Sequence, residues 1–155
     1  MYRLERNLTL DIDPIVLWDF IATPRNLDQI TPPNLGFKIL SNVPDEMYDG
    51  LQIRYEISIP LFGRHEWLTE ISEIIPGESF VDMQIEGPYR HWRHYHQLLP
   101  VGNNASCMID RIDYQVPFGI FGSATHALVI KKQLDEIFNY REEALLDIFG
   151  LNKET

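Results

Sequence analysis

The chain has 155 residues, of which 45% are hydrophobic and 12% aromatic, and a formal net charge of −10. This length suits one domain, which we expect to span residues 1–155, and the composition is typical of a globular protein rather than a disordered one. The acidic balance disfavours binding to nucleic acid or to anionic membrane surfaces, since both call for a basic surface.

Three further features bear on the location of the protein. Cys107 is the single cysteine, which excludes an internal disulfide and fits a reducing cytoplasm. The first twelve residues alternate charged and apolar side chains, unlike a signal peptide. No apolar run approaches the roughly 18 residues of a membrane-spanning helix. We therefore expect a cytoplasmic protein without an integral membrane segment.

The spacing of apolar residues changes twice in the first part of the chain. Tyr2–Leu10 alternates apolar and polar residues, which predicts a strand. Beyond Asp13, which can cap a helix and is followed by proline, apolar residues recur at helical spacing. Pro24 ends this helix. A second short helix is expected over residues 25–30, and the sequence TPPN at Thr31–Asn34 then breaks the chain.

Six further strands are predicted, separated by turn residues such as Pro76–Gly77 and Gly87–Pro88. Their ranges are Phe37–Val43, Leu51–Pro60, His65–Ile75, Ser79–Glu86, Tyr89–Leu98 and Ser106–Val116. Short turns between consecutive strands indicate an antiparallel meander. The last segment, Ser123–Phe149, has a broad apolar stripe at helical spacing, with Ser123 available to cap its start and Gly150 its end. It predicts one long helix.

The order of these elements indicates an α+β fold. About seven antiparallel strands would form one curved sheet, with two short helices after the first strand and a long C-terminal helix. A single sheet has an apolar face that must be covered, and the long helix can cover it. A curved sheet around a helix leaves a cavity between them, which is a common place for a ligand.

The segment YRHWRHYHQL at Tyr89–Leu98 contains three histidines, two arginines and three aromatic residues. Neighbouring residues of a strand point to opposite sides of the sheet. Trp92, His94 and His96 therefore share one face with Leu98. Since Trp92 and Leu98 are large and apolar, we expect this face to be the interior one.

The following strand completes a polar cluster. Four side chains lie on its more apolar face: Met108, Asp110, Ile112 and Tyr114. With a turn at Gly102–Asn104, His96 lies opposite Asp110 and His94 opposite Ile112; a slip of one residue would abolish this pairing. A buried carboxylate beside an imidazole gives both groups a partner and raises the pKa of the histidine.

The strand before these two is harder to orient. Its apolar set is Val81, Met83 and Ile85, and placing this set inside puts Asp82 and Gln84 outside. We expect that orientation, although the sequence leaves open whether Asp82 and Gln84 face the cavity.

Three interpretations of the cluster are open. His94, His96 and Asp110 are interior residues that fix the strand register, or they hold a polar group of a ligand, or they bind a metal ion. His94 and His96 have the H-x-H spacing of two ligands on one strand, with Asp110 as a third. We favour the ligand anchor and expect no metal and no cofactor, and the chain has none of the G-x-S-x-G, phosphate-loop or H-E-x-x-H motifs.

Three segments together resemble a known superfamily. They are GPYRHWRHYHQL at Gly87–Leu98, MIDRIDYQVPFG at Met108–Gly119, and KQLDEIFNYRE at Lys132–Glu142. This pattern is similar to the polyketide cyclase/dehydrase-like branch of the START-related superfamily, whose members share the birch-pollen-allergen-like helix-grip fold. The resemblance covers essentially the whole chain. It implies a helix-grip fold with a deep pocket for lipids, aromatic polyketides, steroids or quinones, and it implies no settled catalytic residues.

The favoured hypothesis is a protein that binds an apolar, aromatic, lipid-like or quinone-like small molecule between the sheet and the long helix. The expected contacts are Tyr55, Trp92, His94, His96, Met108, Asp110, Ile112, Tyr114 and Phe138. A second hypothesis is a cyclase or dehydrase in which His94, His96 and Asp110 move protons. A third is an interaction protein without a ligand, whose partner contacts His91, Arg93 and Tyr95. A monomer and a homodimer are both compatible with the sequence.

Overall fold

The computed structural model describes residues 1–59, 63–117 and 123–150, except the side chains of residues 123, 125 and 126. Its elements are β1 (Tyr2–Leu10), α1 (Pro14–Ile21), the 3-10 helices η1 (Pro24–Ile30) and η2 (Pro33–Leu35), β2 (Lys38–Ile39), β3 (Gln52–Ile59), β4 (Gly63–Ile75), β5 (Ser79–Glu86), β6 (His91–Val101), β7 (Ala105–Gln115) and α2 (Ser123–Phe149). The expected α+β order is confirmed. The motif residues Phe118 and Gly119, the strand end at Pro60, and the capping side chain of Ser123 lie outside the description.

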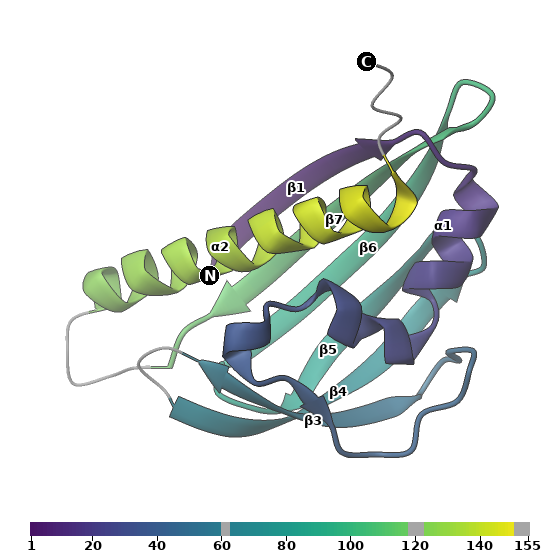
Figure 1. Ribbon diagram of the computed structural model, residues 1–155. Helices are drawn as coiled ribbons and strands as arrows, with labels where there is room; N and C mark the ends of the chain where they lie inside the picture. Colours follow the sequence, from purple (N-terminus) through teal and green to yellow (C-terminus); the bar gives the residue numbers. More distant parts are fainter. Residues whose placement is uncertain (60–62, 118–122, 151–155) are drawn as a thin grey trace.

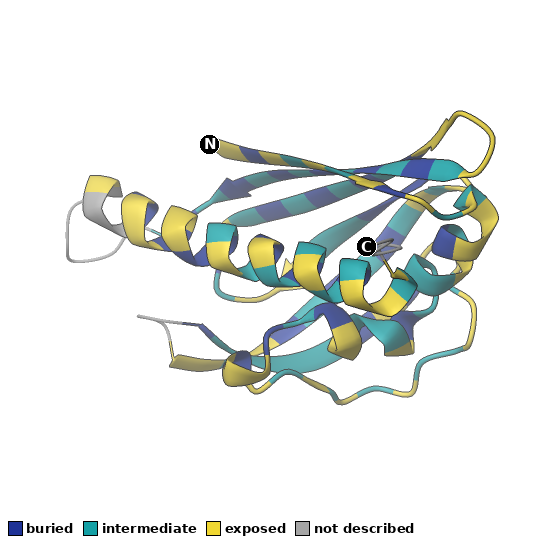
Figure 2. Ribbon diagram, turned by 45° about the horizontal axis from the view of Figure 1, so that its top comes forward, coloured by how far each residue is buried: buried dark blue, intermediate teal, exposed yellow. Residues whose placement is uncertain are grey.

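The seven strands form one antiparallel sheet in the order β1-β7-β6-β5-β4-β3-β2. The meander therefore runs from β2 to β7, and β1 adds to its far edge beside β7. The curved sheet carries α2 across one face, and α1 and η1 cover the rest of the same face (Figure 1). Buried positions alternate with more exposed ones along β6 and β7, as period-2 strands with one interior face require (Figure 2).

The local signals for α1 and α2 act as expected. Asp13 caps α1 by accepting a hydrogen bond from the backbone N–H of Ile15, and Pro14 occupies the first turn, where its missing N–H costs nothing. Gly150 follows α2 with φ of +68°, the left-handed conformation in which glycine commonly ends a helix. The bounds of α2 are those predicted.

One expectation for the segments between α1 and β3 was wrong. The predicted strand at Phe37–Val43 pairs only at Lys38–Ile39. The backbone N–H groups of Leu40 and Ser41 both donate to the carbonyl of Arg54, so the ladder ends there in a bulge. The short helix expected over residues 25–30 is present as the 3-10 helix η1, and η2 begins within the predicted chain break.

The core has three clusters on the inner face of the sheet. One joins β6 and β7 to the middle of α2 through Trp92, Ile112 and Phe138. Another joins β7 and α1 to the last turns of α2 through Leu17, Met108 and Leu145. The third lies under α1 on β3, β4 and β5. The centre of the sheet, between these clusters, is where the polar residues of the predicted site lie.

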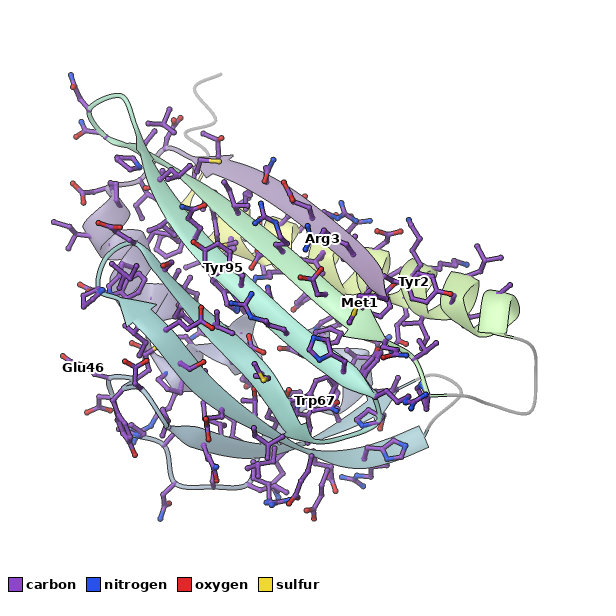
Figure 3. The ribbon with its side chains drawn as sticks, turned by 180° about the vertical axis from the view of Figure 1, so that it is seen from behind. Met1, Tyr2, Arg3, Glu46, Trp67 and Tyr95 are labelled. Carbon is purple, nitrogen blue, oxygen red and sulfur yellow. The ribbon has the colours of Figure 1, made fainter. Side chains whose placement is uncertain are left out.

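The outer face of the sheet is polar. Arg3 of β1 forms a bidentate ion pair with Asp113 of β7, and Arg93 of β6 pairs with Glu73 of β4. Arg3 and Tyr95 are visible on this face, away from α2 (Figure 3). In the part of the chain that the structure describes, no helix combines the length and apolarity needed to cross a bilayer.

Candidate functional site

A pocket of about 180 Å³ lies between the inner face of the sheet, η1 and α2. Its apolar wall comes from β3 and β4, with Ile53 and Trp67, from η1, with Leu27, and from α2, with Leu134 and Phe138. An apolar cavity of about 150 Å³ is large enough to hold benzene. The pocket therefore has room for a ring-sized guest.

The polar end of the pocket is formed by the two predicted histidines. His94 and His96 are 5% and 4% exposed, and their rings lie face to face with centroids 3.6 Å apart and planes inclined by 32°. Phe80 of β5 stacks on His96 at 4.2 Å, and Phe138 of α2 meets His94 edge-on at 5.7 Å. The imidazoles are thus fixed by rings on both sides. The expected inward orientation of Trp92, His94 and His96 is confirmed.

Asp110 lies behind the histidines, 2% exposed. Its Oδ1 is 2.8 Å from Nε2 of His94, which donates a hydrogen bond to it, and 2.9 Å from Nδ1 of His96. The β6–β7 register places His96 opposite Asp110 and His94 opposite Ile112, as predicted. One carboxylate therefore contacts both imidazoles.

Asp82 corrects the predicted orientation of β5. The β5–β6 register pairs Asp82 with His94 and Phe80 with His96, so these β5 residues share the inner face. Oδ2 of Asp82 lies 2.7 Å from Nε2 of His96 and 3.4 Å from Nδ1 of His94. The sequence assignment placed the apolar residues Val81, Met83 and Ile85 inside. Asp82 can point inward instead, because the imidazoles of β6 provide partners for its carboxylate.

Gln84 shares the inner-face alternation but has a structural role. Its side-chain amide donates to the carbonyl of Tyr89 and accepts from the Tyr89 N–H, at 2.7 and 3.2 Å. A Cβ on Gly87 would lie 2.5 Å from the Gln84 Oε1, so a larger residue there would displace the Gln84 side chain from these hydrogen bonds. Gln84 does not line the pocket.

Arg141 of α2 is a site residue that the sequence analysis missed. It is 7% exposed and lines the pocket, with one guanidinium nitrogen 3.6 Å from Oδ1 of Asp110 and the guanidinium carbon 5.8 Å from the Phe138 ring centroid. The signal was present, because Arg141 is a charged residue within the apolar stripe of α2. A charged residue on a buried face needs a partner of opposite charge.

The cluster contains two carboxylates, two imidazoles and one guanidinium, and burial sets their protonation. Burial works against ionisation of Asp110, but Arg141 and the hydrogen bonds of the two histidines outweigh it and hold its pKa well below the usual range. The pKa of Asp82 is likewise lowered, because the two imidazoles outweigh its burial. Both carboxylates are therefore ionised at neutral pH.

The two imidazoles differ in pKa. Burial and the neighbouring charge of His96 lower the pKa of His94 below its ordinary value. Burial also disfavours charge on His96, but its contacts with Asp110 and Asp82 outweigh this and raise its pKa. Of the pair, His96 is the imidazole that holds a proton to the higher pH.

Four pocket-lining side chains have a buried polar atom without a hydrogen-bond partner among the described residues. They are the donors Nε1 of Trp67 and Nε of Arg141, the acceptor Oε1 of Gln133, and Nδ1 of His96, which lies 2.9 Å from Asp110 without hydrogen-bond geometry. Leaving such a group unsatisfied costs about 1–3 kcal/mol. A guest hydroxyl can accept from a donor of this set and donate to Oε1 of Gln133.

The structure divides the nine predicted contact residues into two groups. Tyr55, Trp92, His94, His96 and Phe138 line the pocket. The other four do not line it; they are the β7 side chains Met108, Asp110, Ile112 and Tyr114, all 2% exposed or less. These form the layer on which the lining residues rest, and we retain only the first group as expected ligand contacts.

The histidines of the H-x-H motif have a carboxylate beside them that could share a metal ion with them. That carboxylate belongs to Asp82, whereas the sequence had suggested Asp110 as the third ligand. One potential ligand atom from each of Asp82, His94 and His96 lies within 4.8 Å of the others. Asp110 is on the far side of the rings from Asp82, beside the other nitrogen of each imidazole.

No protein family model matches the sequence, and no curated protein does. Solved structures do match. An aromatase/cyclase, ZhuI from Streptomyces sp. R1128, superposes with a TM-score of 0.76 at 12% identity, over 94% of this chain and 92% of that one. A START superfamily protein from Mycobacterium smegmatis gives 0.71 at 11% identity, over 96% and 99%. The chain has a START-like helix-grip fold.

The helix-grip fold also occurs as part of a longer chain. A nucleoside-diphosphate sugar epimerase from Corynebacterium glutamicum matches 93% of this chain with 28% of its own length, at 17% identity and a TM-score of 0.68. The resemblance inferred from sequence motifs is thus confirmed for the fold. Identities this low do not carry a ligand or a reaction from one protein to another.

The buried position of Asp110 predicts a large loss of stability on neutralisation. Asp110→Asn removes the negative charge between His94, His96 and Arg141, and breaking a buried ion pair in this way costs about 3–5 kcal/mol. Asp113→Asn on the same strand removes only the exposed pair with Arg3 and should cost about 0–1 kcal/mol. Urea denaturation at neutral pH measures both. Equal losses in the two variants would contradict the central role of Asp110.

The opposite pKa shifts predict two separate titrations. In ¹⁵N NMR spectra of the protein in EDTA, His96 should titrate above the ordinary value of 6.5 and His94 below it. In His96→Gln, the pKa of His94 should rise, because the repelling charge is gone while both carboxylates remain. An unchanged His94 titration in this variant would show that the two imidazoles are not coupled.

Proposed function

We propose that the protein binds a small aromatic molecule that carries an oxygen, with the ring in the apolar part of the pocket and the oxygen at its polar end. The observation that carries the proposal is the set of unpartnered groups on Trp67, Gln133 and Arg141 beside an otherwise aromatic and aliphatic wall. Pockets of this type, mostly apolar with a few directed polar groups, are typical of small-molecule sites.

Three properties of the wall support an aromatic guest. Trp67 stacks on Tyr55 at 5.7 Å and meets Trp92 edge-on at 5.2 Å, so a large π surface borders the pocket. The volume of about 180 Å³ favours one or two rings over a long acyl chain. An aromatic ligand also agrees with the fold, since one of the solved structures that share it is an aromatase/cyclase and another is a START superfamily protein.

The unpartnered N–H donors of the pocket wall favour a guest with an acceptor oxygen. Trp67 Nε1 and Arg141 Nε are donors, and donors require a carbonyl, phenol or carboxylate oxygen. Oε1 of Gln133 accepts, so a phenolic hydroxyl could donate to it while accepting from Arg141. A guest without oxygen would leave all three groups unsatisfied.

Two matched comparisons test this proposal. 2-Naphthol should bind at least about tenfold more tightly than naphthalene in isothermal titration calorimetry, since a hydrogen bond to a charged donor contributes about 1.5–3 kcal/mol. Leu134→Trp fills the pocket and should abolish binding, whereas Ile148→Trp, on the exposed side of the same helix, should not change it. Binding that persists in Leu134→Trp, or no binding in the wild type, would overturn the proposal.

A second candidate function is proton transfer to a bound carbonyl compound. It is favoured by one contact, the 2.7 Å hydrogen bond between Nε2 of His96 and Asp82, because both residues line the pocket. A carboxylate and an imidazole that share a hydrogen bond beside an acidic C–H of a carbonyl compound can act together as a general base, with the proton taken up at Asp82, and such a base contributes about 10²–10⁴ in rate. Cyclisation and dehydration both begin with such proton transfers.

Hydrogen exchange at a ketone tests this candidate without knowledge of the substrate. In D₂O, wild-type protein should accelerate exchange of the α-hydrogens of 1-tetralone, followed by mass spectrometry. His96→Gln should lower this rate about 100-fold or more while 1-tetralone still binds. His91→Gln, on the outer face of the same strand, serves as the control. Equal rates in all three proteins would leave binding alone as the function.

A further inference from the structure

The histidine–carboxylate cluster brings more nitrogen and oxygen atoms close together than its hydrogen bonds account for. Four imidazole nitrogens face two carboxylates, at distances of 2.7, 2.8, 2.9 and 3.4 Å. Two of these contacts have hydrogen-bond geometry, Nε2 of His94 with Asp110 and Nε2 of His96 with Asp82, whereas Nδ1 of His96 is buried without a hydrogen-bond partner. One potential ligand atom each from Asp82, His94 and His96 lies within 4.8 Å of the others, close enough to share a cation.

The positions of the four contacts indicate where a cation would bind. If each imidazole donates its N–H to Asp110, through Nε2 of His94 and Nδ1 of His96, both bonds converge on one oxygen of that buried carboxylate. The remaining nitrogens, Nδ1 of His94 and Nε2 of His96, then direct their lone pairs toward Oδ2 of Asp82. These three atoms form a ready set of ligands for a metal ion.

We infer that Asp82, His94 and His96 bind a divalent first-row transition-metal ion, through Oδ2, Nδ1 and Nε2 respectively. In a tetrahedral site with metal–ligand lengths of about 2.0–2.2 Å, ligand atoms lie roughly 3.3 Å apart. The separation of Asp82 Oδ2 from His94 Nδ1 is already 3.4 Å. The separation from His96 Nε2 is 2.7 Å and must widen by a rotation of the Asp82 carboxylate.

Asp110 and Arg141 supply the supporting contacts of such a site. Metal-binding histidines usually donate their second N–H to a carboxylate, which fixes the tautomer and the ring direction. Asp110 accepts such a bond from Nε2 of His94 and lies 2.9 Å from Nδ1 of His96, and Arg141 balances its charge from α2. Phe80 and Phe138 prevent the rings from turning. The ligands are therefore held in place before the ion arrives.

The donor set defines the class of metal. Two imidazoles and one carboxylate suit zinc, ferrous iron or cobalt, whereas magnesium and calcium take oxygen ligands. Asp82, His94 and His96 all line the pocket and Asp110 does not. A bound ion would thus have its remaining coordination positions on the pocket side, where the oxygen of a guest can reach it. The inference goes beyond the proposed function and needs no organic ligand.

Titration of EDTA-treated protein with Zn²⁺ and Co²⁺ tests the site. One ion per chain should bind with a dissociation constant of about 1 µM or tighter, and Co²⁺ should give the visible absorption of a low-symmetry nitrogen–oxygen site. Loss of a carboxylate that only supports a metal ligand weakens metal binding by about 10- to 100-fold. We expect a larger loss of affinity in each of the three ligand variants, Asp82→Asn, His94→Gln and His96→Gln. His91→Gln should bind like the wild type.

Two results would overturn the inference: no binding by the wild type, or unchanged binding in the three ligand variants, which would place the ion elsewhere on the acidic surface. Wild-type ¹⁵N NMR provides a check that does not depend on the folding of variants. Addition of Zn²⁺ should shift Nδ1 of His94 and Nε2 of His96 while the other nitrogen of each ring stays protonated. Shifts at any other pair of nitrogens contradict the ligand assignment. Failure of this test leaves the naphthol test of the pocket unaffected.

Discussion

The carboxylate of Asp110 is the contact on which the interior of this protein depends. It lies on β7, contacts both imidazoles of β6, and faces the guanidinium of Arg141 on α2. Two consecutive strands and the C-terminal helix are thereby joined through one buried charge. Hydrophobic clusters on either side of it pack α2 onto the sheet, but apolar contacts alone do not specify which turn of the helix faces which strand. A buried ion pair does so, because a register shift would leave unpaired charges in the core.

The same requirement explains the chemistry at the end of the pocket. Charged residues inside a sheet must be balanced locally, so each strand of the central trio contributes to one cluster: Asp82 from β5, the histidines from β6 and Asp110 from β7. The rings of Phe80 and Phe138 close the cluster on two sides and leave Asp82 and one edge of each imidazole on the pocket wall. The polar groups of the site are therefore fixed by the packing of the core, and a guest would meet them already oriented.

Much of this arrangement follows from local sequence patterns. The bounds of α2 and β5, the inward face of β6 and the pairing of His96 with Asp110 all follow from period and turn length, and the structure confirms them. Asp82 could not be placed this way, because the interior face of β5 is decided by the imidazoles of the neighbouring strand and not by its own apolar residues. Arg141 lies within the apolar stripe of α2 but was not predicted as a site residue, since the charge it balances lies 31 positions earlier in the sequence. Both misses concern ionic partners across elements, which periodicity within one element does not encode.

The electrostatic balance of the cluster connects its two proposed uses. With Asp82 and Asp110 ionised and Arg141 positive, one further positive charge makes the cluster neutral. A proton on His96 supplies it, consistent with the raised pKa of that imidazole, and a divalent ion supplies it with one charge to spare. The surplus charge would fall on the pocket side, because Asp82, His94 and His96 line the pocket. The same residues would therefore select different guests in the two states. The protonated cluster favours a neutral oxygen, such as that of a ketone or phenol, whereas the metal-bound cluster favours a phenolate or carboxylate.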